Sequence, residues 1–316
     1  MKNPTVLTHE IVVPESLAGQ RLDKALAELF PDYSRSRLQD WIQSGQVLVD
    51  GKLARGKDKV QGGENISIQA ELPAQTTEWQ AQKIALPIIY EDDDILVINK
   101  PVGMVVHPAA GNQQNTMANA LLDYLPQLAQ LPRAGSIHRL DKDTSGLLIV
   151  AKTVEAQTFL VAELQARKIH REYIAVVNGV FISGGTVNEP IARHAKYRQR
   201  RTVSAGGKPS VTHYRIIERF VAHTLLKIIL ETGRTHQIRV HMSHIGHPLL
   251  GDKTYGARPI VPQGASSELI DAIRNFKHQA LHAKRLKFMH PRTKTEMAFE
   301  AEVPQELAKL IALLSS

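Results

Sequence analysis

A short segment of the chain concentrates side chains that could do acid–base or nucleophilic chemistry. Residues 138–143 (HRLDKD) hold five ionisable side chains in six positions, including the carboxylates Asp141 and Asp143. The apolar stretch 146–151 (GLLIVA) follows closely, and such a run is typical of a buried strand. A buried strand could hold the carboxylates in a fixed place, whereas a solvated turn would explain the same polarity without any chemistry.

The spacing of this segment also resembles a calcium-binding loop. Asp141, Asp143, Ser145 and Gly146 match positions 1, 3, 5 and 6 of the EF-hand pattern. Position 12 of that pattern is a glutamate that binds calcium through both oxygens. Here Lys152 stands at that position, directly after a predicted strand. We therefore expect no calcium site.

A second group of polar side chains lies at the start of a predicted helix. Residues 233–241 (GRTHQIRVH) contain two arginines and two histidines. They follow a strand predicted over 225–230 and open a helix predicted over 235–245. The unpaired N–H groups and the dipole of a helix N-terminus attract anions. The segment is therefore a candidate anion site.

Histidines recur in and after this helix, so zinc is an alternative. His241 and His244 are one helical turn apart, His247 drifts only modestly from their face, and His236 precedes them. However, no glutamate accompanies them as in HExxH, and the chain has no cysteine that could complete the site. We therefore expect no metal.

A tyrosine opens another predicted strand. Tyr173 follows Arg171 and Glu172 and begins a strand predicted over 173–177. An aromatic residue at a strand start usually packs in a core. The local pattern alone favours that structural interpretation over a catalytic one.

The composition excludes several classes of protein. The chain of 316 residues has no cysteine, which rules out disulfides, a thiolate nucleophile, an iron–sulfur cluster and cysteine-bound zinc. No uncharged apolar run approaches the roughly 20 residues that a membrane helix needs. Pro4, His9 and Glu10 interrupt the apolar core that a signal peptide requires. We expect a cytoplasmic protein without membrane association.

The formal net charge of +8 is unevenly distributed along the chain. Residues 1–83 sum to −1, and residues 84–316 sum to +9. The densest basic run, residues 193–201 (RHAKYRQRR), has five cations, one histidine and no acid, with Tyr197 among them. A basic stretch with an interleaved aromatic is typical of a nucleic-acid surface; a solvated loop is the alternative.

Residues 14–75 are predicted to form a small α/β module. Apolar side chains recur at helical spacing over 21–30 and 34–43. The alternating stretch 47–49 then runs into Asp50-Gly51, which is a strong hairpin signal.

The remainder of the chain is predicted to be a linker and a larger domain. The stretch 76–87 is rich in glutamine, threonine and alanine and ends in a proline, which indicates a linker. Residues 88–316 mix strands and helices without regular βαβ alternation. This pattern favours an α+β domain built on a large mixed, mainly antiparallel sheet.

Six segments, taken in order, closely resemble the RluA-type pseudouridine synthases. They are NKPVGMVVHP (99–108), HRLDKDTSGLLIVAK (138–152), REYIAVVNG (171–179), GKPSVTHYRI (207–216), ETGRTHQIRVHMSHIGHPLLGD (231–252) and QALHAKRL (279–286). The module at 14–75 resembles an S4 RNA-binding domain, so the resemblance covers nearly the whole chain. It implies an S4-like RNA-binding module followed by a pseudouridine synthase catalytic domain.

The resemblance also implies roles for single residues. Asp141 in HRLD corresponds to the catalytic aspartate, and Tyr173 in REY to the family's tyrosine. Arg239 in HQIR corresponds to the arginine that pairs with the aspartate, and Ile238 to an apolar position under the target base. The sequence leaves open whether Arg239 or Arg234 pairs with Asp141.

Contacts with RNA are expected in both parts of the chain. Arg139, Arg234 and the run 193–201 are candidates for phosphate contacts beside the target nucleotide. Farther away, the S4-like module would hold structured RNA. Its candidate contacts are Arg35, Arg37 and Lys52.

The implied reaction converts a uridine to pseudouridine within RNA. The N1–C1′ bond breaks, the uracil turns and C5 joins C1′, so no redox cofactor, nucleotide or metal is required. A fixed, ionised carboxylate can stabilise or attack the oxocarbenium-like C1′. Whether Asp141 adds to the sugar or first removes a C2′ proton stays open.

The resemblance implies large-subunit (23S) ribosomal RNA or a pre-50S particle as the partner. The clustered uridines of the intersubunit-bridge hairpin are the expected targets, and we expect a monomer without a small-molecule cofactor. Two alternatives remain at this point. One is a related synthase acting on other rRNA or tRNA uridines, and the other is a non-catalytic RNA-binding factor in ribosome assembly.

Overall fold

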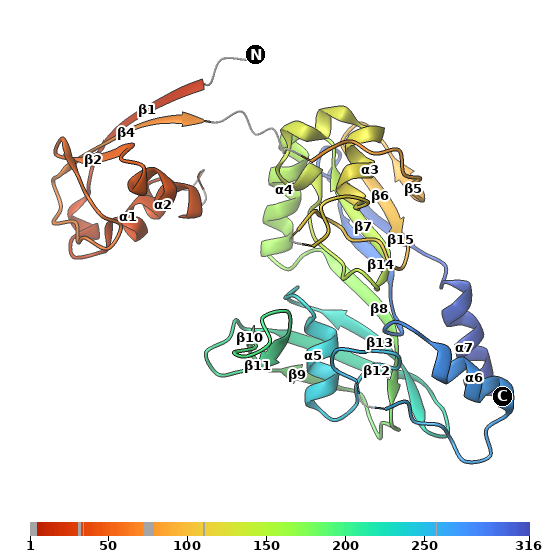
Figure 1. Ribbon diagram of the computed structural model, residues 1–316. Helices are drawn as coiled ribbons and strands as arrows, with labels where there is room; N and C mark the ends of the chain where they lie inside the picture. The colour runs from red at the N-terminus through yellow and green to blue at the C-terminus, as the bar shows by residue number, and fades with distance from the viewer. Residues whose placement is uncertain (1–4, 31–32, 34, 73–78, 110, 257) are drawn as a thin grey trace. The chain divides into compact units, whose positions relative to one another are not determined.

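The computed structural model describes residues 5–30, 33, 35–72, 79–109, 111–256 and 258–316. At positions 5, 6, 35–37, 71 and 72 it describes the backbone alone. The chain divides into two compact units, Met1–Thr76 and Thr77–Ser316 (Figure 1). Each unit has its own hydrophobic core.

The described part of the first unit combines an antiparallel sheet with two helices. Its elements are β1 (Thr5–Val12), the 3-10 turn η1 (Glu15–Leu17), α1 (Leu22–Leu29), α2 (Arg35–Gln43), β2 (Val47–Val49), β3 (Lys52–Leu53) and β4 (Asn65–Leu72). The sheet order is β1-β4-β2-β3. Leu22 and Leu26 of α1 pack with Leu38 and Ile42 of α2 in one buried cluster, so both predicted helices and the hairpin are confirmed.

Strand β1 is an element that the sequence pattern did not predict. It pairs with β4 along its whole length, from Thr5 opposite Leu72 to Val12 opposite Asn65. The partner strand lies about sixty residues later, and the consecutive polar residues Thr8, His9 and Glu10 interrupt the apolar pattern of β1. A pairing so distant in sequence leaves no local signal that separates such a strand from an extended loop.

A mixed sheet forms the centre of the second unit. Its strands are β5 (Ile88–Glu91), β6 (Ile95–Lys100), β7 (Ser145–Ala151), β8 (His170–Asn178), β9 (Gly185–Asn188), β12 (Val211–Arg219), β13 (His223–Leu230), β14 (Leu281–Met289) and β15 (Glu296–Glu300). The order is β5-β6-β7-β14-β8-β13-β12-β9, with β15 beside β14. Among these described pairs, β7 with β14 is the parallel one, so the predicted mixed, mainly antiparallel sheet is confirmed.

Helices and a small ribbon complete the described part of this unit. The helices are α3 (Met117–Tyr124), η2 (Pro126–Gln130), η3 (Pro132–Gly135), α4 (Val154–Gln165), α5 (Gln237–His244), α6 (Ser267–Asn275) and α7 (Gln305–Ser315). The ribbon joins β10 (Ile191–Arg193) to β11 (Arg201–Val203). Helix α4 contacts β7, whereas α5 contacts β11 and β12 near the other end of the sheet (Figure 1). Helix α6 and the ribbon were not predicted.

Part of the predicted linker makes specific contacts with the second unit. Trp79 and Leu86 pack against its main core. The N–H of Gln82 donates to the carbonyl of Asn119 at 3.0 Å, and the Asn119 amide donates to the carbonyl of Gln80 at 2.7 Å. Residues 79–87 are therefore held along the second unit.

Strand β14 lies in the sheet between β7 and β8. Strand β7 begins just after the polar segment 138–143. Ala283 lies opposite Gly146 on one side and Tyr173 of β8 on the other. Gly146 has φ +114°, and a Cβ there would overlap the backbone of Ala283. Only glycine lets β7 begin this close to β14, so the local geometry after Asp141 depends on it.

A buried histidine makes the stability of this fold sensitive to acid. His223 is fully buried, and neither ring nitrogen has a hydrogen-bond partner among the described residues. Burial lowers the pKa of His223 to about 4, whereas an unfolded chain titrates near 6.5. Between these values the unfolded state binds more protons, so stability falls as the pH drops from about 6.5 to about 4.

Between pH 7.5 and pH 4.5 the free energy of unfolding should fall in both proteins. We expect the fall to be about 2 kcal/mol smaller in His223→Leu than in the unchanged protein. Urea unfolding at the two pH values measures the difference. His244→Leu, which replaces an exposed histidine, serves as the control and should follow the unchanged protein. An equal loss in the His223→Leu protein would contradict the prediction.

Candidate active site

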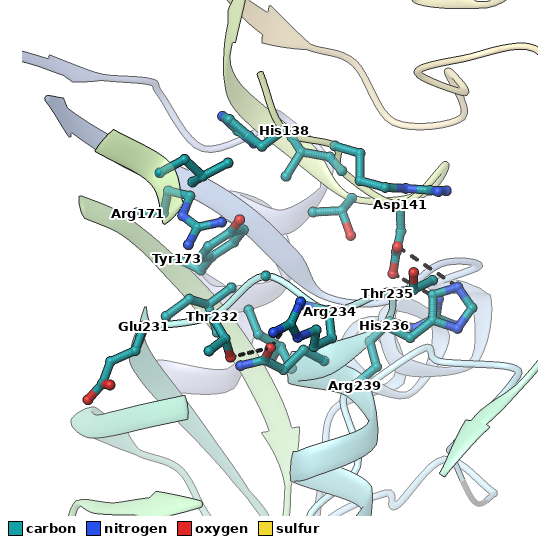
Figure 2. Close-up of a pocket in the computed structure, with 18 of the residues that line it drawn as sticks. His138, Asp141, Arg171, Tyr173, Glu231, Thr232, Arg234, Thr235, His236 and Arg239 are labelled. Atoms are coloured by element: carbon teal, nitrogen blue, oxygen red, sulfur yellow. Dashed lines mark hydrogen bonds and ion pairs between the residues drawn. The ribbon is translucent and has the colours of Figure 1, made fainter. Parts of the chain in front are cut away.

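A cavity of about 450 Å³ in the second unit is lined by three of the segments that the sequence singled out (Figure 2). They are the loop before β7, the start of β8 and the beginning of α5. Among the lining residues are six of the predicted site residues, Arg139, Asp141, Tyr173, Arg234, Ile238 and Arg239. Residues almost 100 positions apart in the sequence are therefore neighbours in one pocket.

Asp141 and Arg239 form an ion pair at the wall of this cavity. The Nη1 atom of Arg239 donates to Oδ2 of Asp141 at 3.1 Å (Figure 2). Arg234, the other candidate, is exposed, and its Nε donates to the carbonyl of Pro209 at 3.4 Å. The structure thus answers the question that the sequence left open, because Arg239 is the arginine that contacts Asp141.

A second carboxylate, which the sequence analysis missed, holds Arg239 in place. Asp252 accepts from Nε and Nη2 of Arg239 at 2.7 and 2.9 Å, which is the strong two-point geometry of an arginine–carboxylate pair. The backbone N–H groups of Thr254 and Tyr255 also donate to Asp252. The guanidinium is therefore fixed on one side and presents a single N–H to Asp141 on the other.

Burial and hydrogen bonding shift the pKa values of Asp252 and Arg239. Burial alone would raise the pKa of Asp252, but hydrogen bonds from Arg239 and from two backbone amides lower it below its ordinary value. Burial opposes the charge on Arg239 as well, yet Asp252 and Asp141 raise its pKa. Both groups of the supporting pair therefore stay ionised at neutral pH.

The start of helix α5 completes the surroundings of Asp141. His236 caps the helix in a left-handed conformation, with φ 60°, and its Nε2 lies 3.9 Å from Oδ1 of Asp141. Burial lowers the pKa of His236. The Gln237 amide donates to the carbonyl of Val211 and accepts from the N–H of Arg234. These bonds attach the helix start to strand β12, so Arg239 projects from a fixed element.

A buried lysine holds the loop that carries Asp141. Lys100 is fully buried, and its Nζ donates to the carbonyls of Pro101, Met104 and Lys142 at 2.8, 2.9 and 3.0 Å. Burial lowers the pKa of Lys100 to about 7, against the pull of Asp141 and Asp143. The sequence contained Lys100 in the segment NKPVGM but offered no spacing rule that would link it to position 142.

Two uncharged groups form apolar parts of the cavity wall. Tyr173 on β8 is 4% exposed, and Ile238 on α5 is also 4% exposed. Burial raises the pKa of Tyr173, so its phenol stays protonated at neutral pH. The aromatic ring belongs to the main core cluster and lines the pocket as well, which unites the structural and functional interpretations of this residue.

Exposed cations lie at the cavity and on the ribbon near it. Arg139 and Arg234 are exposed residues that line the cavity. The basic run 193–201 spans the last residue of β10, the turn and the first residue of β11. In the turn, Lys196 and Arg200 lie over the ring of Tyr197 at 5.6 and 5.3 Å from its centroid. The Arg201 N–H donates to the Tyr255 hydroxyl, next to the ion-pair network.

The candidate RNA contacts of the first unit are only partly described. Lys52 is exposed on β3. Arg35 and Arg37 lie in the first turn of α2, but their side chains fall outside the described residues.

The zinc hypothesis loses its geometric basis. Both ring nitrogens of His241 are within bonding distance of other groups, the Thr212 hydroxyl and the Glu189 carbonyl, and His247 bonds to the carbonyl of Asn178. Within the described ranges, the four histidines do not form a cluster of potential metal ligands.

The family comparisons agree with this fold and this pocket. Residues 94–244 match the family model described as RNA pseudouridylate synthase, and residues 20–66 match that of the S4 domain. The matched synthase segment contains the partly buried Asp141, its ion-pair partner Arg239 and the Tyr173 that lines the same cavity. The chain belongs to the RNA pseudouridylate synthase family and carries an S4 domain at its N-terminus.

Curated relatives cover almost the whole chain. Ribosomal large subunit pseudouridine synthase D of Salmonella typhimurium is 58% identical over 300 residues, which is 95% of this chain and 92% of the relative. The proteins of the same name from Yersinia pestis and Pseudomonas aeruginosa are 56% and 54% identical over 305 and 302 residues. They cover 96% of this chain and 94% of each relative.

Two solved structures of human proteins share the fold of most of this chain. Human RNA Pseudouridylate Synthase Domain Containing 1 matches with a TM-score of 0.56 and 25% identity, over 74% of this chain and 89% of its own. Human RNA Pseudouridylate Synthase Domain Containing 4 matches with a TM-score of 0.57 and 24% identity, over 72% of this chain and 92% of its own.

In the described part of the chain, every helix is too short or too polar to cross a membrane.

Proposed function

We propose that this chain isomerises specific uridines to pseudouridine in large-subunit (23S) ribosomal RNA. The observation that carries the proposal is the ion pair between Asp141 and Arg239 at the cavity wall. It occurs in a chain 58% identical to an enzyme named for this substrate. A protein that only binds RNA has no need of a carboxylate held in this way among cations, so the alternative of a non-catalytic assembly factor is disfavoured.

In the proposed reaction the target uridine leaves its stack and enters the cavity. Flipping is required because C1′ of a stacked nucleotide is out of reach of any side chain. The uracil then lies against Tyr173 and Ile238, and Asp141 faces the sugar. Arg239 holds the carboxylate directed at C1′, where positive charge develops as the N1–C1′ bond breaks.

The proposed contacts with the rest of the RNA follow the exposed cations. Arg139, Arg234 and the ribbon 193–201 would bind phosphates near the flipped nucleotide. Arg35, Arg37 and Lys52 would bind structured RNA farther away. We assign the first set to a catalytic domain at 88–316 and the second to an S4-like RNA-binding domain at 14–75. The stretch 76–87 joins the two domains, and its residues 79–87 lie along the catalytic domain.

The proposed biological setting rests on the relatives. We propose the clustered uridines of the intersubunit-bridge hairpin as targets, with free 23S rRNA or a pre-50S particle as substrate. The enzyme would act as a monomer in the cytoplasm without a cofactor or a metal. A related synthase that modifies other rRNA or tRNA uridines is the second candidate, because the active site would be the same.

Mapping pseudouridines in cells that lack the protein tests this function. We expect specific pseudouridines to disappear from 23S rRNA and to return when the unchanged gene is restored. Restoring the Asp141→Asn gene should leave them missing. Loss at tRNA positions instead would favour the second candidate, and an unaltered map would refute the proposal.

A further inference from the structure

One buried cation in the cavity takes no part in the network described above. Arg171 lies on β8 two residues before Tyr173, so both side chains are on the same face of the strand. Its side chain lines the cavity beside Tyr173, on the side away from His236 (Figure 2). The residue is only 6% exposed.

Arg171 is buried without a partner for its charge. Its Nε atom has no hydrogen bond, and it forms no ion pair with any carboxylate in the described ranges. Two acids near it bind other cations, since Glu172 pairs with Lys227 and Glu231 with Arg167. A buried, unpaired charge is strongly unfavourable. Its presence in a cavity therefore indicates that a ligand supplies the missing negative charge.

The neighbours of Arg171 leave room for its guanidinium. Burial and the charge of Arg171 lower the pKa of His138 to about 3, so this ring stays neutral and adds no second cation. Gly233 faces the guanidinium, and a Cβ at that position would come within 2.6 Å of Nη1 of Arg171. Glycine at 233 thus allows Arg171 the position that it has.

The depth of Arg171 decides which part of the RNA it can meet. The exposed arginines at the cavity, Arg139 and Arg234, are placed to bind phosphates, which stay near solvent. The flipped base goes deepest and stacks on Tyr173, the neighbour of Arg171 on the same strand face. The carbonyl oxygens O2 and O4 at the edge of that base are acceptors for a guanidinium.

We propose that Arg171 is a further catalytic residue that binds the uracil edge and stabilises the negative charge formed when the base leaves the sugar. The inference rests on the proposed function. When N1–C1′ breaks, its electron pair stays on the uracil and spreads to O2 and O4. The same electrons then form C5–C1′, the proton on C5 leaves and N1 gains a proton, so the product is an isomer of uridine. A fixed guanidinium acts where this charge develops.

The first test compares Arg171→Met with Arg274→Met, which removes an exposed arginine of α6 that does not line the cavity. With a 23S rRNA hairpin, the single-turnover rate of Arg171→Met should fall about 100-fold or more. Its Kd for RNA should stay within about threefold of the unchanged protein. Its Tm should rise, since methionine removes an unpaired buried charge. The control should keep all three values.

The outcomes separate this inference from the proposed function. If the unchanged protein forms no pseudouridine, the function fails. If it does and Arg171→Met keeps a rate within about threefold, only the inference is overturned. If the Kd of Arg171→Met for RNA rises by the same factor as its rate falls, Arg171 binds a phosphate instead. If the Tm of Arg171→Met is lower than that of the unchanged protein, Arg171 is a structural residue. Either result also overturns the inference.

A second test uses 5-fluorouridine at the target position. Fluorine withdraws electrons and makes the uracil a better leaving anion, so this substrate depends less on Arg171. Loss of 5-fluorouridine, measured after RNA digestion, should show a defect in Arg171→Met at least about fivefold smaller than with uridine. An equal defect would overturn the electrostatic role. Gly233→Ala, which shifts the guanidinium but keeps its charge, should also lower the rate without changing Kd.

Discussion

Asp141→Asn should abolish pseudouridine formation and leave the affinity for RNA within about threefold of the unchanged protein. Asparagine has nearly the same shape as aspartate, and its oxygen can still accept the 3.1 Å bond from Arg239. The change removes the negative charge that faces C1′ and the only group in our mechanism that can attack there. We expect the single-turnover rate to fall by at least about 10³-fold. Analysis of the nucleosides after RNA digestion measures it.

A matched substitution two residues away controls for this result. Asp143 is partly exposed and lies in the same loop, but no proposed step involves it. Asp143→Asn should therefore turn over at a rate within about threefold of the unchanged protein. Turnover by Asp141→Asn at a similar rate would refute the assignment of Asp141 as the catalytic carboxylate.

Arg239→Met should damage stability and activity together. The side chain of Asp252 has 0% exposure, so removing its arginine leaves a buried carboxylate without a cation, at a cost of about 3–5 kcal/mol. Asp141 also loses the N–H that orients it, and the rate should fall about 100-fold or more. Urea unfolding and single-turnover kinetics measure the two effects separately.

A double variant distinguishes the two effects of Arg239. In Arg239→Met/Asp252→Asn the buried negative charge is absent, yet the asparagine oxygen still accepts from the backbone N–H groups of Thr254 and Tyr255. More than half of the lost stability should return, whereas the rate should stay low. Recovery of the rate together with stability would show that Arg239 acts only through folding.

The sequence predicted those parts of the site whose chemistry is concentrated in short segments. Asp141 stands among five ionisable residues, and Arg239 belongs to a helix start rich in cations. The fold class followed from the mixture of strands and helices. The choice between Arg239 and Arg234 required geometry, because both stand near the same helix start and only the direction of each side chain separates them.

The residues that the sequence missed act through contacts without a local pattern. Asp252 is a single carboxylate 13 residues after its partner Arg239. Lys100 contacts a backbone carbonyl 42 residues away, and any residue offers such a carbonyl. Arg171 stood in a segment whose tyrosine attracted attention, and only its burial without a partner singles it out. Strand β1 was missed for the same reason, because its partner β4 lies about sixty residues later in the sequence.

The position of β14 has a consequence for the order in which the protein is made. This strand, Leu281–Met289, lies between β7 and β8, and so between the loop of Asp141 and the strand of Tyr173. During synthesis both of these segments leave the ribosome more than 100 residues before the strand that sets their spacing. A nascent chain therefore cannot assemble the cavity until synthesis is nearly finished, since non-local strands pair last.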